Sequence, residues 1–146
     1  MNGDARTVLL VEDEPAHAEI VRRNFAEFQP SGRLLHVPDG QAALDYLYRR
    51  AGYRDPERSP RPALILLDLR LPRVDGLEVL KTVKADPELH RIPVVVLTTS
   101  AAESDVASAY DHRANSYLVK PVDFSRFVAL MEALGRYWLT WNEIPS

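Results

Sequence analysis

The sequence predicts an α/β fold, a doubly wound five-stranded parallel sheet. Five short apolar or β-branched runs alternate along its 146 residues with five segments of helical periodicity. The runs at 63–67 and 92–97 are apolar at nearly every position, as in strands that are buried on both faces. Connections that contain a helix force parallel pairing, so helices are expected on both faces of the sheet.

The first predicted strand is Thr7–Val11, which stops at an acidic segment. A helix is expected after it, because Pro15 suits a first helical turn and acidic residues favour a helix N-terminus. The apolar stripe of this helix is predicted to contain Ile20, Val21, Phe25 and Phe28.

A weaker strand is predicted at Arg33–Val37, followed by Asp39 as the N-cap of a second helix. The apolar stripe expected in that helix contains Ala43, Leu44, Leu47 and Tyr48. Residues 49–62 are rich in Arg, Pro and Gly and show no periodicity, so we expect a surface loop before the central strand.

The central strand ends at Asp68, and Asp75–Gly76 precedes a helix with Leu77, Leu80 and Val83 facing inward. The next helix, at about 103–112, is polar and is expected to bury the least apolar surface, with Val106, Ala107 and Tyr110 as its inward candidates. A last strand is predicted at 116–119, and Asp123 can cap a final helix. The core stripe expected in the final helix contains Phe124, Phe127, Val128, Met131 and Leu134.

Composition excludes several classes of function. There is no cysteine, which rules out disulfides and thiolate chemistry, and the net charge of −3 gives no general attraction to nucleic acid. No segment has the length and apolarity of a signal peptide or a membrane span. A cytoplasmic protein without a nucleic-acid or membrane partner is therefore expected.

Polar residues stand where the predicted strands end, and in open α/β sheets the functional crevice lies outside those ends. Each residue alone would be an ordinary helix cap, acidic first turn or surface lysine. Together they place three carboxylates, a hydroxyl and an ammonium on one rim of the sheet. These residues are Glu12, Asp13, Asp68, Thr98 and Lys120.

The combination predicts a phosphotransfer site. Neighbouring carboxylates repel one another unless a cation joins them, and oxygen ligands without His or Cys favour Mg²⁺. Lys120 and Thr98 supply donors for an anion, so the metal and Lys120 can offset the charge of a phosphoryl group. Asp68 is the expected nucleophile, because it is central and alone on its strand.

Four motifs, VLLVEDE, LILLDLRLPRVDG, VVVLTTS and SYLVKP, resemble those of receiver domains of two-component response regulators. The resemblance covers about residues 7–134 and implies a flavodoxin-like (βα)5 fold with strand order 2-1-3-4-5. The loop at 49–62, the TTS segment and the YWL segment near the end are similar to those of single-domain regulators that are partners of bacterial and cyanobacterial phytochromes.

The resemblance implies that Asp68 accepts a phosphoryl group from a phosphohistidine on a sensor histidine kinase, one that belongs to a bacteriophytochrome in the narrower match. Mg²⁺ would be held by Glu12, Asp13, Asp68 and the backbone carbonyl of Arg70. Lys120 would pair with Asp68 and then with the phosphate.

The same resemblance implies a switch made of Thr98 and Tyr117, in which Thr98 moves toward the phosphoryl group and Tyr117 changes its burial. The alternative is that Tyr117 is an ordinary half-buried residue of the strand, with no role in a switch. The Lys120-Pro121 peptide bond is expected to be cis. Arg70 and Ser100, at positions thought to tune hydrolysis, are not water-positioning acids or amides, and Thr99 is β-branched, which predicts a long-lived acyl phosphate.

Residues 1–146 are expected to form a single receiver domain without an output domain, so that the signal passes through protein contacts. Residues 135–146 form an aromatic extension with Tyr137, Trp138, Leu139 and Trp141. This extension either completes the core or joins a homodimer formed through the predicted helix at 103–112, the strand at 116–119 and the final helix.

Other interpretations are weaker. The chain is not expected to be a dedicated enzyme: an aspartyl-phosphate phosphohydrolase would want a second acid where Arg70 stands. A flavodoxin-type cofactor site would need a phosphate-binding loop where the acidic residues 12–14 stand. The four histidines show no ligand spacing, and His17, near the acidic rim, is a candidate contact for a partner protein.

Overall fold

The computed structural model describes residues 6–29 and 32–145. Within them, five parallel strands form one sheet in the order β2-β1-β3-β4-β5, which confirms the predicted fold class. The strands are β1 (Thr7–Val11), β2 (Arg33–Val37), β3 (Leu64–Leu67), β4 (Val94–Thr98) and β5 (Ser116–Val119). None of the helices in the described residues could cross a membrane.

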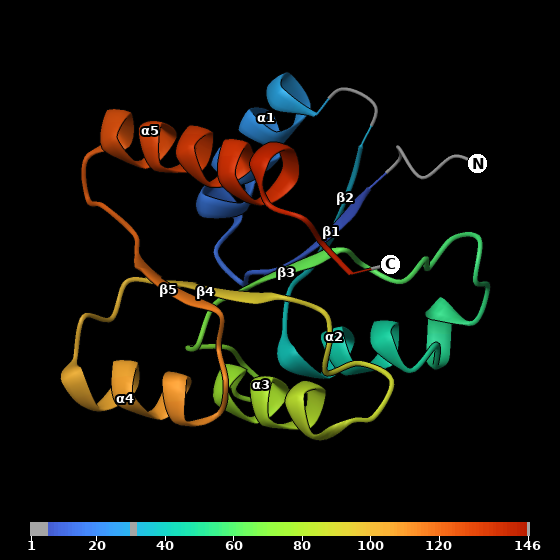
Figure 1. Ribbon diagram of the computed structural model, residues 1–146. Coiled ribbons are helices and arrows are strands. Elements are labelled where there is room, and N and C mark those ends of the chain that lie inside the picture. Colours follow the sequence, from blue (N-terminus) through green and yellow to red (C-terminus); the bar gives the residue numbers. More distant parts are fainter. Residues whose placement is uncertain (1–5, 30–31, 146) are drawn as a thin grey trace.

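The helices cover both faces of the sheet (Figure 1). On one face lie α1 (Pro15–Phe28) and α5 (Phe124–Gly135). On the other face lie α2 (Gly40–Leu47), α3 (Gly76–Ala85) and α4 (Glu103–Asp111).

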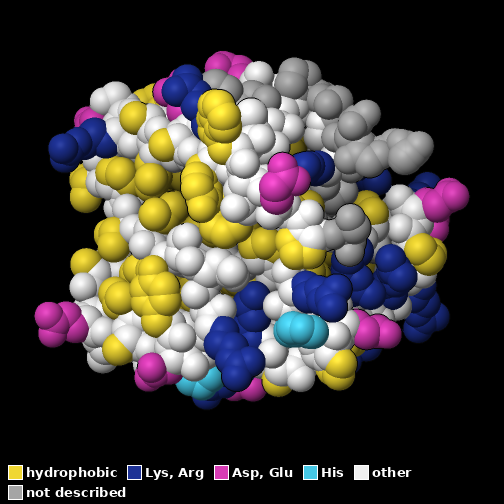
Figure 2. Space-filling view, in the orientation of Figure 1, with side chains coloured by type: hydrophobic (Ala, Val, Ile, Leu, Met, Phe, Trp, Pro, Cys, Tyr) yellow, Lys and Arg dark blue, Asp and Glu magenta, His cyan; other side chains and the backbone are white. Residues whose placement is uncertain are grey.

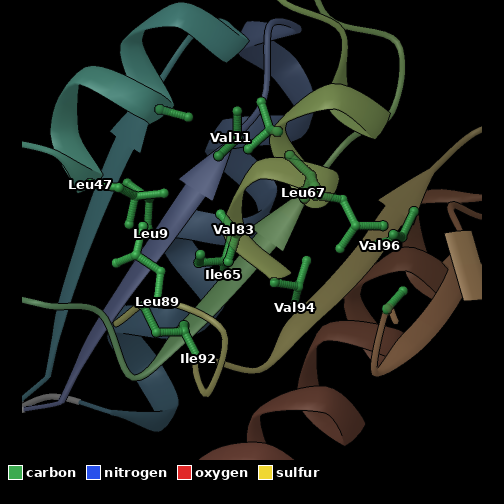
Figure 3. Close-up of a cluster of buried hydrophobic side chains, with 14 of the residues drawn as sticks. Leu9, Val11, Leu47, Ile65, Leu67, Val83, Leu89, Ile92, Val94 and Val96 are labelled. Carbon is green, nitrogen blue, oxygen red and sulfur yellow. The ribbon is translucent and has the colours of Figure 1, made fainter. Parts of the chain in front are cut away.

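Each face of the sheet has its own hydrophobic core, because successive strand residues point to opposite faces. Leu9, Ile65 and Val94 pack with Leu47 of α2 and Val83 of α3 (Figure 3). The second core, under α1 and α5, contains the alternate strand residues Val8, Leu10, Leu64, Leu66, Val95 and Leu97. The central strands are apolar at successive positions because both of their faces are buried.

The loop between α2 and β3 is more ordered than the sequence suggests. It contains a short 3₁₀ helix, η1 (Ala51–Tyr53), and the ring of Tyr53 makes an edge contact with Tyr46 at 5.5 Å. The Tyr46 hydroxyl donates a hydrogen bond to the carbonyl oxygen of Pro60 (2.6 Å), and burial raises the pKa of Tyr46 to about 12. Tyr46 is therefore the core tyrosine of α2, and the prediction for Tyr48, which is exposed, is wrong.

Two other predicted core stripes need correction. In α4 the buried residue is Ala109, whereas Ala107 and Tyr110 are exposed, although the helix does bury little, as predicted. In α5 the predicted residues Phe127, Met131 and Leu134 are buried, but Phe124 is 65% exposed. Phe124 is the first residue of its helix, and the buried residues of that helix all lie further along it.

The aromatic extension at 135–146 is partly packed on the core and partly exposed. After α5 the chain continues as a π-helical segment, η2 (Arg136–Trp141), in which Leu139 is buried and Trp138 packs against the core of α1 and α5. Tyr137 and Trp141 are 55% and 77% exposed. Leu139 and Trp138 thus complete the core, whereas Tyr137 and Trp141 do not.

Gly76 allows α3 to begin directly against the segment that carries Asp68. A Cβ atom on Gly76 would lie 2.1 Å from the carbonyl oxygen of Asp68 and 2.6 Å from the Cα of Leu69. The backbone N–H of Gly76 donates to the carbonyl oxygen of Leu69 at 2.9 Å. Any side chain at this position would have to displace the backbone at Asp68.

We expect Gly76→Ala to lower the free energy of unfolding by about 2 kcal/mol, because the added methyl group meets backbone atoms that cannot move without strain. Urea unfolding measures this change. Gly52→Ala is the matched control, since a Cβ at Gly52 meets nothing within 4 Å, and its effect should stay within about 0.5 kcal/mol. Equal losses in the two variants would contradict the steric argument.

Candidate functional site

The carboxyl ends of the strands bring the predicted site residues together. Glu12 follows β1 and its backbone N–H donates to Val37, at the end of β2 (3.1 Å). Asp68 follows β3 and donates in the same way to Val11 (3.1 Å), and Lys120 follows β5 and donates to Thr98 (2.7 Å). Sheet hydrogen bonding thus continues beyond the strands and fixes the backbone of each of these residues.

Three carboxylates form a cluster that fits a divalent cation. One oxygen from each of Glu12, Asp13 and Asp68 can be chosen so that all three lie within 4.8 Å of one another. Glu12 and Asp68 are buried, whereas Asp13 is exposed and leaves the cluster open to solvent. An oxygen-only donor set of this kind suits a hard cation such as Mg²⁺ or Mn²⁺.

The ammonium of Lys120 is shared between the two buried carboxylates. Its Nζ lies 2.6 Å from Oε1 of Glu12 and 2.9 Å from Oδ2 of Asp68, and its side chain is only 2% exposed. Burial raises the pKa of Glu12, and the hydrogen bond and positive charge of Lys120 oppose that rise. Both carboxylates are thus held close to a cation even before a metal ion binds.

His17 supplies a third partner for Lys120, which the sequence did not predict. Its Nδ1 lies 3.0 Å from Nζ of Lys120, and its ring packs against Phe127 of α5 at 5.7 Å between centroids. Burial lowers the pKa of His17, and the charge of Lys120 lowers it further. A neutral imidazole with its proton on Nε2 accepts the third ammonium hydrogen, so His17 faces Lys120 and is only partly open to a partner protein.

Thr98 has an unused hydroxyl beside this cluster. The residue is fully buried at the end of β4, and its Oγ1 has no hydrogen-bond partner. A buried hydroxyl without a partner is costly and is unusual in a native structure. The hydroxyl is therefore available to an oxygen atom that enters the site.

A second network links the neighbouring loops to α4. The guanidinium of Arg70 forms an ion pair with Asp105, and Oγ of Ser100 donates to the same carboxylate. The hydroxyl of Tyr117, on β5, donates to the carbonyl oxygen of Ser100 at 2.9 Å. Two residues flanking the site, Arg70 and Ser100, are thus held by one acid of α4.

The prediction of a cis peptide bond between Lys120 and Pro121 is wrong. Every peptide bond in the described residues is trans, including the bond between Lys120 and Pro121. The trans form is intrinsically favoured before proline by about 0.5–1 kcal/mol. Lys120 reaches both carboxylates with this bond in the trans form.

The sequence is similar to those of known response regulators. Residues 8–132 match the family model of the response regulator receiver domain. The chain is 46% identical over 143 residues to the probable methanogenesis regulatory protein FilR2 of Methanothrix harundinacea, covering 98% of this chain and 90% of that protein. It is 40% identical over 141 residues to the response regulator Rcp1 of Synechocystis sp., covering 97% of this chain and 94% of that protein.

Two solved structures are similar along almost their whole length. The phosphorylated cyanobacterial phytochrome response regulator RcpA is 37% identical, with a TM-score of 0.92 and coverage of 97% of this chain and 99% of that chain. The Mn²⁺-bound form of Rcp1 is 40% identical, with a TM-score of 0.91 and the same coverage. The protein therefore belongs to the receiver-domain family of response regulators.

Proposed function

We propose that the chain is a stand-alone response regulator that accepts a phosphoryl group on Asp68 from a phosphohistidine of a sensor histidine kinase. The observation that carries the proposal is the position of the Asp68 carboxylate, which is buried, clusters with Glu12 and Asp13, and lies 2.9 Å from the ammonium of Lys120. The transfer breaks the P–N bond of the phosphohistidine and forms a P–O bond to Asp68. The neutral imidazole of the kinase leaves.

The residues around Asp68 have separate roles in this proposal. The cluster of Glu12, Asp13 and Asp68, with the backbone carbonyl of Arg70, holds a divalent ion, and we propose Mg²⁺. When bound, that ion offsets the negative charge of the carboxylates and the phosphoryl oxygens. Lys120 shifts from the carboxylate of Asp68 to a phosphoryl oxygen, and Thr98 donates its free hydroxyl to another.

Thr98 and Tyr117 form the proposed switch. The hydroxyl of Tyr117 is bound to the carbonyl oxygen of Ser100, two residues after Thr98. A movement of Thr98 toward the phosphoryl group pulls on this same segment and alters the position of Tyr117. The new charge at Asp68 thereby changes the surface formed by α4 and β5.

The acyl phosphate is proposed to be long-lived. Hydrolysis needs a group that positions water, and Arg70 and Ser100, which stand two residues after Asp68 and Thr98, are both bound to Asp105. The same ion pair weighs against a phosphohydrolase, which needs an acid at position 70. The chain is a receiver domain and not a dedicated enzyme.

A homodimer is proposed for the surface made by α4, β5 and α5. Tyr110, Val119, Tyr137 and Trp141 are exposed there, and Figure 2 shows hydrophobic side chains gathered over these elements. A groove of about 380 Å³ between β5 and α5 is lined by Leu118, Leu130, Tyr137 and Trp138 among others. Contiguous apolar surface of this kind is typical of interfaces.

The proposed unit of function is the single receiver domain of residues 1–146, acting in the cytoplasm. For the kinase, we propose one that belongs to a phytochrome, because RcpA, a phytochrome response regulator, shares the fold along nearly the whole chain.

We expect wild-type protein incubated with Mg²⁺ and a small phosphodonor to gain the mass of one phosphoryl group, and Asp68→Asn to gain none. Intact-mass spectrometry measures both. Asp111→Asn, which changes an exposed carboxylate of α4, is the control and should be phosphorylated like wild type. An equal adduct on Asp68→Asn would refute the proposed acceptor.

We expect the acyl phosphate to have a half-life of minutes or longer. Arg70→Asn should shorten it by about tenfold, because an amide at this position can orient a water molecule. Loss of the phosphoryl mass with time gives the rate. Arg73→Asn, an exposed change three residues further along, should leave the rate unchanged. A wild-type half-life of seconds would overturn the proposal of slow hydrolysis.

The double variant Tyr137→Ser/Trp141→Ser should weaken dimerisation by about a thousandfold, since truncating an aromatic hot-spot residue at an interface costs about 2 kcal/mol or more. Sedimentation velocity measures the change. Both residues are exposed, so the fold should be retained. Tyr48→Ser, at the C-cap of α2 and outside the proposed interface, is the control. A wild type that sediments as a monomer would reject the dimer.

A further inference from the structure

A second cavity lies at the opposite edge of the sheet from Asp68. The segments that precede β1, β3 and β4 meet there, through a hydrogen bond from Ala63 N–H to Thr7 (2.7 Å) and another from Ile65 N–H to Pro93 (3.0 Å). These segments, with Ile144 and Pro145, line an open cavity of about 630 Å³. Small-molecule sites usually have volumes of about 300–1,000 Å³.

The lining of this cavity is positively charged. Arg6, Arg61 and Arg91 line it, and Glu88 is its only acidic lining residue among those the structure describes. Lys and Arg side chains, with a histidine, gather on this face in Figure 2. The whole chain carries a net charge of −3, so this concentration of cations is local.

The three arginines are not neutralised by carboxylates. In the described part of the chain none of them takes part in an ion pair, and Arg61 donates instead to the carbonyl oxygen of Leu47 at 3.0 Å. Nη1 of Arg6 is buried and has no hydrogen-bond partner. A buried guanidinium nitrogen without an acceptor is costly, so the hydrogen-bonding capacity of the Arg6 side chain is only partly used within the protein.

Prolines and side-chain hydrogen bonds restrict the backbone of the cavity walls. Five prolines contribute to them, Pro60, Pro62, Pro87, Pro93 and Pro145. The ammonium of Lys84 donates to the carbonyl oxygens of His90 (3.0 Å) and Ile92 (2.9 Å), which fixes the segment before β4. A site that is already ordered loses little entropy when a ligand binds.

We propose that this cavity binds a small organic anion. Its phosphate or carboxylate oxygens pair with the guanidinium groups of Arg6 and Arg91, whose planar donor pairs match both kinds of oxyanion. Its apolar part lies against Ile92 and Ile144. The site is separate from the phosphorylation site and gives the domain a second input at the other end of the same strands (Figure 1).

The test is an NMR titration of ¹⁵N-labelled full-length protein in metal-free buffer, with adenosine monophosphate in one series and citrate in another. We expect saturable shifts at residues 6–7, 60–63, 87–93 and 144–145. Arg6→Gln and Arg91→Gln should each weaken binding by about tenfold or more, as for a lost hydrogen bond between charged groups. Arg54→Gln, an exposed change outside the cavity lining, should bind like wild type.

The two series separate the sources of the oxyanion: response to the nucleotide alone identifies a phosphate ligand, and response to citrate alone a carboxylate ligand. Asp68→Asn should bind as wild type does, so failure of this site and failure of the phosphorylation proposal are distinguishable. No shift at the cavity with either probe at millimolar concentration would overturn the proposal. An equal loss of binding in Arg54→Gln would also overturn it, because binding would then follow overall charge. Spectral dispersion of each variant reports whether it is folded.

Discussion

The arrangement around Lys120 depends on a single shared charge. One buried ammonium lies between the carboxylates of Glu12 and Asp68, each of which would be costly to bury alone. A buried ion pair contributes little net stability compared with an apolar replacement, because desolvation offsets the attraction. Its value here is geometric, since it holds the ends of β1, β3 and β5 at fixed distances from one another.

The surrounding packing maintains that geometry. His17 and Phe127 connect Lys120 to α1 and α5 on one face of the sheet. On the other face, Gly76 places the start of α3 against the carbonyl oxygen of Asp68. The carboxylate of Asp68 is thus positioned by elements from both layers of helices, although its own segment is short.

The sequence predicted those features that follow from local pattern. Strand positions, helix order and the five rim residues could be identified because apolar runs, caps and strand ends are encoded in neighbouring residues. The contacts of His17 and Tyr46 could not, because each depends on a partner distant along the chain, Lys120 in one case and Pro60 in the other. The exposure of Phe124 and Tyr110 likewise depends on how far the neighbouring elements extend.

The division of the core into two halves has a consequence for divergence among related proteins. Successive residues of each strand belong to different packing layers, separated by the backbone of the sheet. Substitutions that repack α1 against α5 therefore need no compensation beneath α3 and α4, and the reverse also holds. One layer can be remodelled for a new partner while the other keeps its inherited packing.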